Sequence, residues 1–190
     1  MCDIHLEVLK DSLVSKRIEV QPPHPIHTLM EEHKIILENL QKLGSLIERL
    51  KQMHDFAAMD SDLDELKEVA HHLVEAENHH QREEEVLFPS LRAHDIVEPP
   101  DIMKMDHDEF RKRKQELFKL ASNHSDYNFN DFKKEVLSAG AYLVKELDSH
   151  IFKEDNILYQ IALQVLNEDE WQEIKRENDK IGYCCFTPQG

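Results

Sequence analysis

The chain has 190 residues, enough for one domain with a sizeable apolar core. Acidic residues outnumber basic ones by 39 to 23, and the formal charge of −16 argues against nucleic acid or an anionic membrane as a partner. The three cysteines form no Cys-x-x-Cys pair, and no segment has the apolar length of a signal peptide or a membrane span, so we expect a protein of the reducing cytoplasm.

The chain is predicted to open with an arm rather than with a long helix. Residues 1–22 form this N-terminal arm, in which residues 3–15 have the pattern of a short amphipathic helix. The prolines of VQPPHP, residues 20–25, end any such helix.

Apolar residues then recur with a helical period through most of the chain. In the first stripe, Leu37 and Leu40 share a face with His33. Ser61 is a candidate N-cap of the second helix, and Pro89 would end or kink that helix. With few glycines and prolines, the composition favours an all-helical fold. We therefore predict an all-α fold with short flanking helices. Residues 23–167 are expected to form an antiparallel up-down-up-down four-helix bundle, with helices at about 26–53, 61–92, 101–122 and 130–166. A short helix and a tail are expected to follow over residues 168–190.

Two halves of the sequence resemble each other. LMEEHKIILENLQKL (29–43) aligns without gaps with MKMDHDEFRKRKQEL (103–117), and HHQREEEVLF (79–88) aligns with HIFKEDNILY (150–159). A histidine preceded by an acid, followed later by His-x-x-x-Glu, therefore occurs twice at nearly equal spacing. The paired positions are His33 and His107, His79 and His150, and Glu83 and Glu154.

The spacing gives this repeat a chemical meaning. Positions i and i+4 of a helix lie about 40° apart and one turn along, so each His-x-x-x-Glu projects an imidazole and a carboxylate from one face. That face is the apolar stripe, where a buried carboxylate is costly unless it is paired or bound to a metal. Carboxylates can bridge two cations, and imidazoles suit iron, zinc or copper. The candidate metal ligands are His33, His79, Glu83, His107, His150 and Glu154.

Other interpretations of the histidines stay open. A single histidine on an apolar stripe is usually a hydrogen-bonded core residue, but two sets in register are harder to explain in this way. His80 and Glu84 form a second pair, offset by one residue from His79 and Glu83. The sequence does not decide which pair binds metal, although the repeat favours His79 and Glu83. His80 could also be an extra ligand, and His27 could reach the end of the bundle.

Four segments together resemble the haemerythrin-like, or HHE cation-binding, family. EEH at 31–33 resembles the first-helix signature of that family, and HHQREEEVLFPSL resembles the second. EPPDIMKMDHDEF and HIFKEDNILY resemble the third and fourth, so the resemblance covers residues 24 to about 165. The opening HPIHTLMEEH and the closing EWQEIKRENDKIGYC are similar to a subgroup that is often fused to a sensory domain, and we expect no fused domain here.

This resemblance implies a di-iron centre in a four-helix bundle, with carboxylate bridges and an open position for O₂, NO or peroxide. It places the same six candidate ligands at the metals. Oxygen-carrying haemerythrins have His-x-x-x-His on the third helix, whereas here Arg111 follows His107 at that spacing. In those proteins the acid on the fourth helix lies five residues after the histidine, which is the position of Asp155 here, although the repeat favours Glu154 as the metal ligand. The missing histidine argues against simple O₂ carriage and fits six-ligand members that serve sensing, iron handling or stress responses.

We therefore expect a cofactor of two iron ions, or of another divalent metal such as zinc, in a protein that binds or senses O₂, NO or iron without turnover. The first alternative is a di-iron oxidase or a peroxide-consuming enzyme. Ferritin-like oxidases use Glu-x-x-His, the reverse order, and the His-Glu-x-x-His of zinc hydrolases is absent. The second alternative is a structural bundle that acts through partners. Metal content separates this alternative from the others, and turnover of peroxide or ferrous ion separates binding from catalysis.

Overall fold

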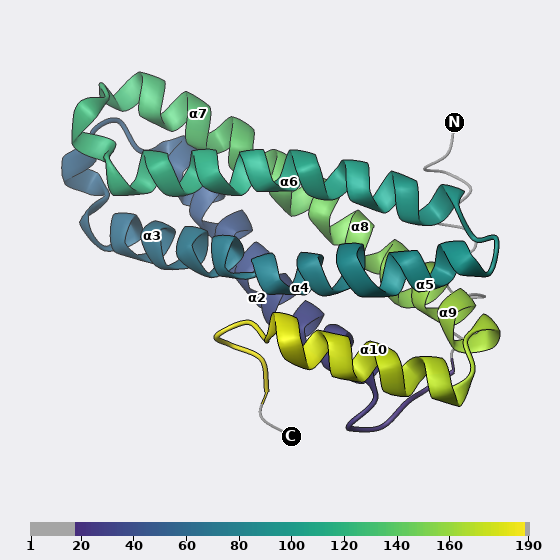
Figure 1. The fold of residues 1–190 in the computed structure, drawn as a ribbon. Helices are drawn as coiled ribbons and strands as arrows, with labels where there is room; N and C mark the ends of the chain where they lie inside the picture. The colour runs from purple at the N-terminus through teal and green to yellow at the C-terminus, as the bar shows by residue number, and fades with distance from the viewer. Residues whose placement is uncertain (1–17, 189–190) are drawn as a thin grey trace.

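The structure, a computed structural model, describes residues 18–188, which are mostly helical and include no strand (Figure 1). The predicted fold class, all-α, is confirmed for this part of the chain. The predicted helix at 3–15 and most of the N-terminal arm lie outside the described residues. None of the helices between residues 18 and 188 has both the length and the apolar character that crossing a membrane requires.

The first long helix, α2 (Pro25–Gln52), begins where the proline-rich segment ends. His24 is its N-cap, and its side chain accepts a hydrogen bond of 3.2 Å from the amide of Ile26. Pro25 takes the first helical position, where a missing N–H costs nothing. The inner face of α2 carries Leu29 and Ile36 on either side of His33, and all three side chains are buried.

The second segment has a more broken course than its sequence pattern predicts. After a short 3-10 turn, η1 (Phe56–Ala58), it consists of α3 (Asp60–Glu75), α4 (Glu77–Arg82), the π-helical turn η2 (Glu83–Leu87) and α5 (Phe88–Ala93). The predicted cap at Ser61 is wrong, because the helix already begins at Asp60 after Met59. Pro89 does not end the segment, because it lies in the first turn of α5, where the lack of a backbone N–H is tolerated.

The third and fourth segments begin slightly earlier than predicted. α6 (Glu98–Ser122) takes the prolines of the EPP break into its first turn. After η3 (His124–Asp126), Asn128 caps the fourth segment and accepts from the amide of Asp131 at 3.0 Å. This segment comprises α7 (Phe129–Tyr142), η4 (Leu143–Leu147), α8 (Asp148–Lys153), η5 (Glu154–Leu158) and α9 (Tyr159–Val165). Both η4 and η5 are π-helical turns.

The four segments pack around a shared interior. α2 contacts α3 and α7, and α6 contacts the same two helices from the other side (Figure 1). Their buried apolar side chains form two clusters. One includes Leu43, Leu66 and Leu117, and the other includes Leu29, Phe88 and Met103. The histidines and glutamates singled out by the sequence repeat lie between these clusters along the segments.

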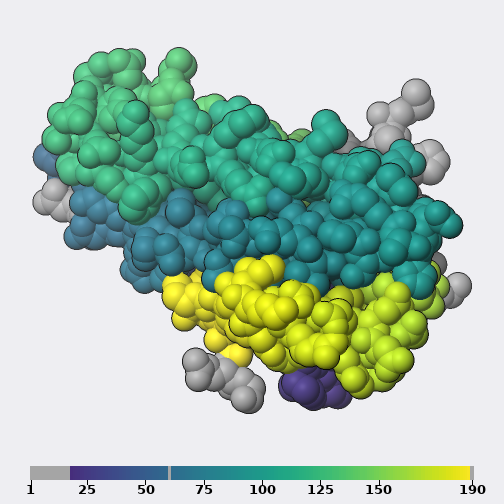
Figure 2. All heavy atoms as spheres, in the orientation of Figure 1, coloured from purple at the N-terminus to yellow at the C-terminus, as the bar shows by residue number. Residues whose placement is uncertain are grey.

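The last helix, α10 (Glu168–Ile181), lies against the outside of the bundle (Figure 2). Asn167 and Glu170 form a reciprocal capping box at its start. α10 packs on α2, α4 and η2 and buries Trp171 and Ile174. The chain then turns at Gly182, whose positive φ of 89° suits glycine, and returns toward α2.

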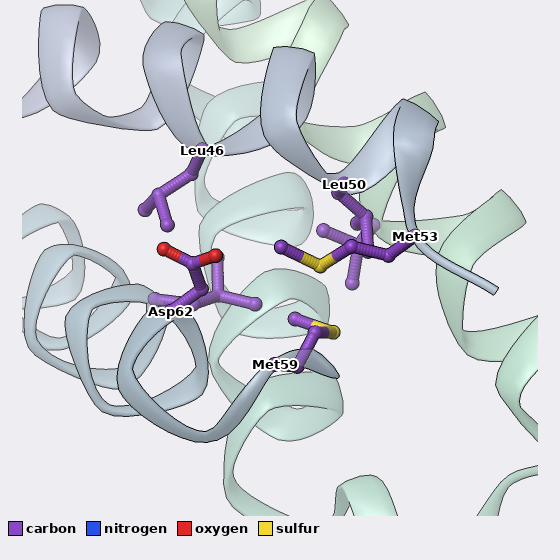
Figure 3. Close-up of a pocket in the computed structure, with 7 residues that line it drawn as sticks. Leu46, Leu50, Met53, Met59 and Asp62 are labelled. Atoms are coloured by element: carbon purple, nitrogen blue, oxygen red, sulfur yellow. The ribbon is translucent and has the colours of Figure 1, made fainter. Parts of the chain in front are cut away.

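The apolar end of the bundle contains a small cavity (Figure 3). Its volume is about 10 Å³, and its lining is apolar apart from Asp62. A space of this size holds a single water at most. This cavity is therefore too small for a larger ligand.

Candidate metal centre

A layer of polar side chains crosses the bundle between the two apolar clusters. Its members come from α2, α4, η2, α6, α8 and η5, and none of them is more than 1 % exposed. We call them the polar layer. The polar layer consists of His33, His79, Glu83, His107, His150 and Glu154, the six residues that the sequence predicts as metal ligands.

The four imidazoles of the polar layer form two pairs. Nε2 of His33 lies 3.0 Å from Nε2 of His79. Nε2 of His107 lies 2.9 Å from Nε2 of His150. In each pair, the nitrogens that could bind a metal face each other in the interior of the bundle.

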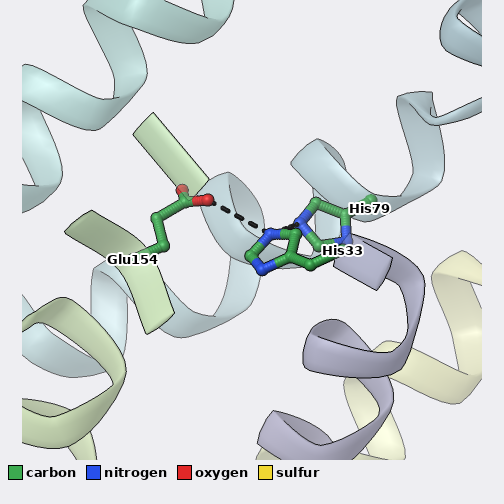
Figure 4. A group of neighbouring side chains, drawn as sticks. All are labelled: His33, His79 and Glu154. Carbon is green, nitrogen blue, oxygen red and sulfur yellow. Dashed lines mark hydrogen bonds and ion pairs between the residues drawn. The ribbon is translucent and has the colours of Figure 1, made fainter. Parts of the chain in front are cut away.

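Glu154 lies between the two pairs. Its Oε2 is 3.3 Å from Nε2 of His33. Its Oε1 is 2.8 Å from Nε2 of His150 and 3.4 Å from Nε2 of His107. Glu154 therefore completes two groups of donor atoms, each able to surround one cation: one with His33 and His79 (Figure 4), the other with His107 and His150.

One carboxylate oxygen of Glu83 lies near both imidazole pairs. Its Oε2 lies 3.4 Å from Nε2 of His79 and 3.6 Å from Nε2 of His107, and it has no hydrogen-bond partner. Its Oε1 accepts a hydrogen bond of 2.6 Å from the hydroxyl of Tyr159. In the repeat, Tyr159 corresponds to Phe88, which has no hydroxyl to offer Glu154. The two carboxylates are therefore held differently in an otherwise symmetric layer.

The backbone widens at both glutamates. The π turns η2 and η5 begin at Glu83 and Glu154, and the amides of Phe88 and Tyr159 each donate to the carbonyl of the glutamate five residues earlier. Single π turns inside α-helices are rare and often occur at functional sites. Proline does not explain both, because Gln160 stands where the second segment has Pro89. The internal repeat thus extends to the backbone around the polar layer.

Each imidazole of the polar layer also has a carboxylate at its outer nitrogen. Such a partner keeps the proton on Nδ1 and turns the lone pair of Nε2 inward, as metal binding requires. We call these four acids the supporting carboxylates. Asp155 lies 2.8 Å from Nδ1 of His33, Glu32 lies 2.8 Å from that of His79, Glu84 lies 2.9 Å from that of His107, and Asp106 lies 3.1 Å from that of His150.

The supporting carboxylates follow the repeat. The acid before the first histidine supports the second histidine of its own half, as Glu32 does for His79. The acid after the glutamate supports the first histidine of the other half, as Asp155 does for His33. This exchange connects the two halves through hydrogen bonds as well as through packing.

Glu32 is the most enclosed of the supporting carboxylates. The guanidinium of Arg82 donates to both its oxygens at 2.5 and 2.6 Å, and the hydroxyl of Thr187 donates to one of them. Arg82 in turn lies 4.7 Å above the ring of Tyr183. Burial alone would raise the pKa of Glu32, but its hydrogen bond to His79 and the charges of His79 and Arg82 lower it to about 2. The C-terminal tail therefore covers an ionised carboxylate that holds one of the inner imidazoles.

The two supporting carboxylates of His107 and His150 are more open to solvent than Glu32. Asp106 is 34 % exposed and receives Lys153 at 3.3 Å. Glu84 binds Arg111 at 2.8 Å and Lys104 at 3.2 Å. Arg111, which follows His107 by one helical turn, thus points away from the polar layer toward acidic partners.

The other proposed ligands lie outside the two donor groups. Glu84 faces the outer nitrogen of His107, whereas Oε2 of Glu83 lies on the inner side, 3.4 Å from Nε2 of His79. The ring of His80 is buried and stacks on His107 at 4.1 Å, and its Nε2 faces Lys114. His27 is 27 % exposed, and its nearest acid is a neighbour on the surface of α2 at 3.9 Å.

The spacing of the inner donors fits a pair of cations. Two nitrogens that bind one octahedral ion side by side at about 2.1 Å would lie about 3 Å apart. The two imidazole pairs have separations of 3.0 and 2.9 Å. The unpartnered Oε2 of Glu83 adds a buried acceptor that lacks a donor in the described chain. The donor set, four imidazoles and two carboxylates, suits iron or zinc.

Without a cation, the polar layer must hold protons. Burial raises the pKa of Glu83 well above its usual value, and the charge of Glu154 adds to the effect. Burial would also raise the pKa of Glu154, but the charge of His150 and the hydrogen bonds between Glu154 and its neighbouring imidazoles lower this pKa well below its usual value. Burial would lower the pKa of His33, yet the charge of Asp155 and hydrogen bonds to Asp155 and Glu154 raise it to about 10. A proton on Glu83 and one on His33 thus take the place of cationic charge.

Sequence reasoning missed the supporting role of the acids. The sequence shows the signals, because an acid precedes His33 and His107 and another follows Glu83 and Glu154. Periodicity alone assigns these acids to the flank of the stripe. It does not show which imidazole of another helix each acid reaches.

One comparison with known proteins bears directly on this site. A family model described as Hemerythrin HHE cation binding domain matches residues 24–162. The matched region contains the whole polar layer and all four supporting carboxylates. Among curated proteins, none matches the chain.

Proposed function

The chain belongs to the haemerythrin HHE cation-binding family, and from that membership we propose that it holds two iron ions in the polar layer and uses them to bind or sense O₂, NO or iron itself. Cation binding is the property that the family name and the donor groups share. The choice of iron, the number of ions and the small ligand are our proposal.

One observation carries the proposal. All four inner imidazoles have their Nδ1 atoms beside carboxylates, at 2.8 to 3.1 Å. Four inward-facing lone pairs would repel one another in a protein without cations or protons between them. Orientation of imidazoles by outer carboxylates is a regular feature of metal sites and is usually needed for full affinity.

We assign one ion to His33 and His79 and the other to His107 and His150. Glu154 would bridge them, because its two oxygens approach different pairs. Glu83 would contribute Oε2, the oxygen that Tyr159 does not occupy. This assignment uses the six residues predicted from the sequence repeat.

Four imidazoles and two carboxylates leave coordination positions open on a pair of octahedral ions. A reduced iron pair would supply both an open position and electrons for a diatomic ligand. The protein's own part is to orient the imidazoles through the supporting carboxylates and to exclude bulk water, since the polar layer is buried between apolar clusters.

We also infer the up-down-up-down order of the four segments. Support comes from short connections and from packing, because α2 contacts both the next segment and the last one. In this order the residues from 23 to 167 form the bundle, and α10 with its tail is an addition to it. Each half of the repeat then contributes two neighbouring segments to the polar layer.

The proposal is tested by loading the protein with ferrous ion under anaerobic conditions. We expect two iron ions per chain and an optical change on addition of NO or O₂, without sustained consumption of peroxide. His79→Ala and His150→Ala should each lower iron content, because each removes a ligand of a different ion. His27→Ala is the matched control and should retain full iron content, since His27 lies outside the donor groups.

Equal iron content in all four proteins would refute the ligand assignment even if the fold were right. Sustained turnover of peroxide or ferrous ion would instead favour an enzyme. If the protein takes up no metal, the result would favour the alternative of a structural bundle that acts through partners.

A further inference from the structure

The C-terminal tail, residues 182–188, reaches the polar layer through one carboxylate. It follows α10 and turns back over α2 and α4 (Figure 1). The side chain of Asn78, on α4, donates to a carbonyl of the tail at 3.1 Å. The hydroxyl of Thr187 donates to Glu32, and Glu32 supports His79. The tail is thus two hydrogen bonds away from a proposed metal ligand.

This tail carries two adjacent cysteines in different environments. Cys184 is 6 % exposed, whereas Cys185 is exposed to solvent. Cys185 also lines a surface hollow of about 760 Å³, together with Thr187. A small oxidant can therefore reach the sulfur of Cys185 while that of Cys184 is shielded. Redox-sensing cysteines are solvent-accessible and often lie beside a second cysteine that resolves the first oxidation product.

A disulfide between these two cysteines is incompatible with the tail as it lies in the structure. The sulfur atoms of a disulfide are about 2.05 Å apart. Here both thiols are free, one in the interior and one at the surface, so bond formation requires Cys184 to leave the interior. The carbonyl of Cys184 accepts from the amide of Thr187 at 3.0 Å. Displacement of Cys184 therefore moves the residue that donates to Glu32.

We propose that Cys184 and Cys185 form a peroxide-sensitive modification site. Oxidation to a disulfide detaches the C-terminal tail from Glu32 and thereby weakens cation binding at His79. The effect on cation binding rests on the proposed function, whereas the modification itself does not. Because the two events share one structural change, the coupling is reciprocal, and a bound cation should slow formation of the disulfide.

The chemistry takes two steps. The sulfur of Cys185 attacks hydrogen peroxide, the O–O bond breaks, and a sulfenic acid and water are formed. The sulfur of Cys184 then attacks the sulfur of Cys185, the S–O bond breaks, and the thiol proton leaves with the hydroxide as a second water. Two thiols thus give up two electrons and two protons, one peroxide is reduced to two waters, and a disulfide remains.

Zinc is the probe cation, because it has no redox chemistry of its own. The parent protein for the test carries Cys2→Ser, so that the two tail cysteines are its remaining thiols. We expect peroxide to remove two hydrogens from the peptide that contains Cys184 and Cys185, as measured by mass spectrometry. The oxidised protein should bind zinc about 10–100-fold more weakly in competition with a chelator, as expected when the partner of a ligating histidine is disturbed. A thiol reductant should reverse both changes.

Two variants separate this coupling from a direct role of the thiols and from packing. Cys185→Ser is the matched control, because it cannot form the disulfide and should bind zinc like the parent protein before and after peroxide. Thr187→Val removes the hydroxyl that donates to Glu32 and keeps both tail thiols. We expect Thr187→Val to bind zinc more weakly before oxidation and to lose less affinity on oxidation. A tail that serves packing alone would leave the response to peroxide unchanged in this variant.

Each component of the proposal can fail separately. Absence of the disulfide after peroxide overturns the modification site, and a disulfide with unchanged zinc affinity overturns its coupling to Glu32. Weaker zinc binding by Cys185→Ser before oxidation would show that the thiols bind zinc themselves, which also overturns the coupling. If the parent protein binds neither zinc nor iron, the proposed function fails together with the coupling, while mass spectrometry still decides on the modification site.

Discussion

Glu32 is the position where stability and metal affinity should be lost together. Glu32→Ala removes the partner of Arg82, a guanidinium that is 1 % exposed and donates to both oxygens of Glu32. Removing one member of a buried ion pair costs about 3–5 kcal/mol, because the other charge stays buried. For a domain of this size, that corresponds to a fall in melting temperature of roughly 6–20 °C.

The same substitution removes the carboxylate at Nδ1 of His79, 2.8 Å away. Loss of such a partner typically weakens metal affinity by about 10–100-fold. Stability is best measured by thermal unfolding of the metal-free protein. Metal affinity is best measured by competition with a chelator of known affinity. The two losses have separate physical causes, so a control should separate them.

Asp106 provides that control. It is the repeat partner of Glu32 and supports His150 at 3.1 Å, but it is 34 % exposed, and its lysine partner is 28 % exposed. An exposed ion pair contributes about 0–1 kcal/mol. Asp106→Ala should therefore weaken metal affinity like Glu32→Ala but lower the melting temperature by only about 4 °C at most. Equal destabilisation by both variants would refute the argument from burial, and unchanged metal affinity in both would refute the role of the supporting carboxylates.

Three further outcomes follow from the structure. His33, with its pKa raised from 6.5 to about 10, stabilises the metal-free protein fully below pH 6.5, and this stability is lost as pH rises through about 10. The melting temperature of the chelated protein should therefore fall across that range. Calorimetric titration with metal at pH 8, in buffers of different ionisation enthalpy, should show that metal binding releases protons. Tyr159→Phe removes a buried hydrogen bond of 2.6 Å to Glu83 and should cost about 1–3 kcal/mol by denaturant unfolding of the metal-loaded protein, with the helical circular dichroism unchanged. Gly140→Ala should destabilise the protein, because the new Cβ would lie 2.9 Å from a side chain of α2. Gly44→Ala should stabilise the protein by about 0.5–1 kcal/mol, because the nearest side-chain atom is 3.9 Å from the new Cβ. The opposite order of melting temperatures would contradict the close contact between α2 and α7.

The sequence allowed prediction of the helices and of the residues that face the interior. The ends of the predicted helices agree with the observed ones to within a few residues, as the last residue of α6, Ser122, and the first residue of α10, Glu168, illustrate. Periodicity alone could not choose between His79 and His80, because neighbouring positions are only about 100° apart and both fit a broad inner stripe. The ungapped repeat made that choice, since only one of the two has a histidine counterpart at His150.

The rest of the candidate site depends on contacts between helices. The partner of each supporting carboxylate comes from another helix, so it depends on packing and rotamers rather than on spacing within one segment. The π turns at Glu83 and Glu154 leave no mark in a 3.6-residue pattern. Lys114 also escaped notice, because a lysine at one position of a stripe is usually assigned to a solvated flank, whereas here it is 3 % exposed.

Anomalous X-ray scattering at the iron edge, from crystals of the iron-loaded protein, tests the central claim most directly. We predict two iron peaks inside the bundle, one between the Nε2 atoms of His33 and His79 and the other between those of His107 and His150, with Glu154 between them. A single peak, or peaks outside the polar layer, would contradict the account.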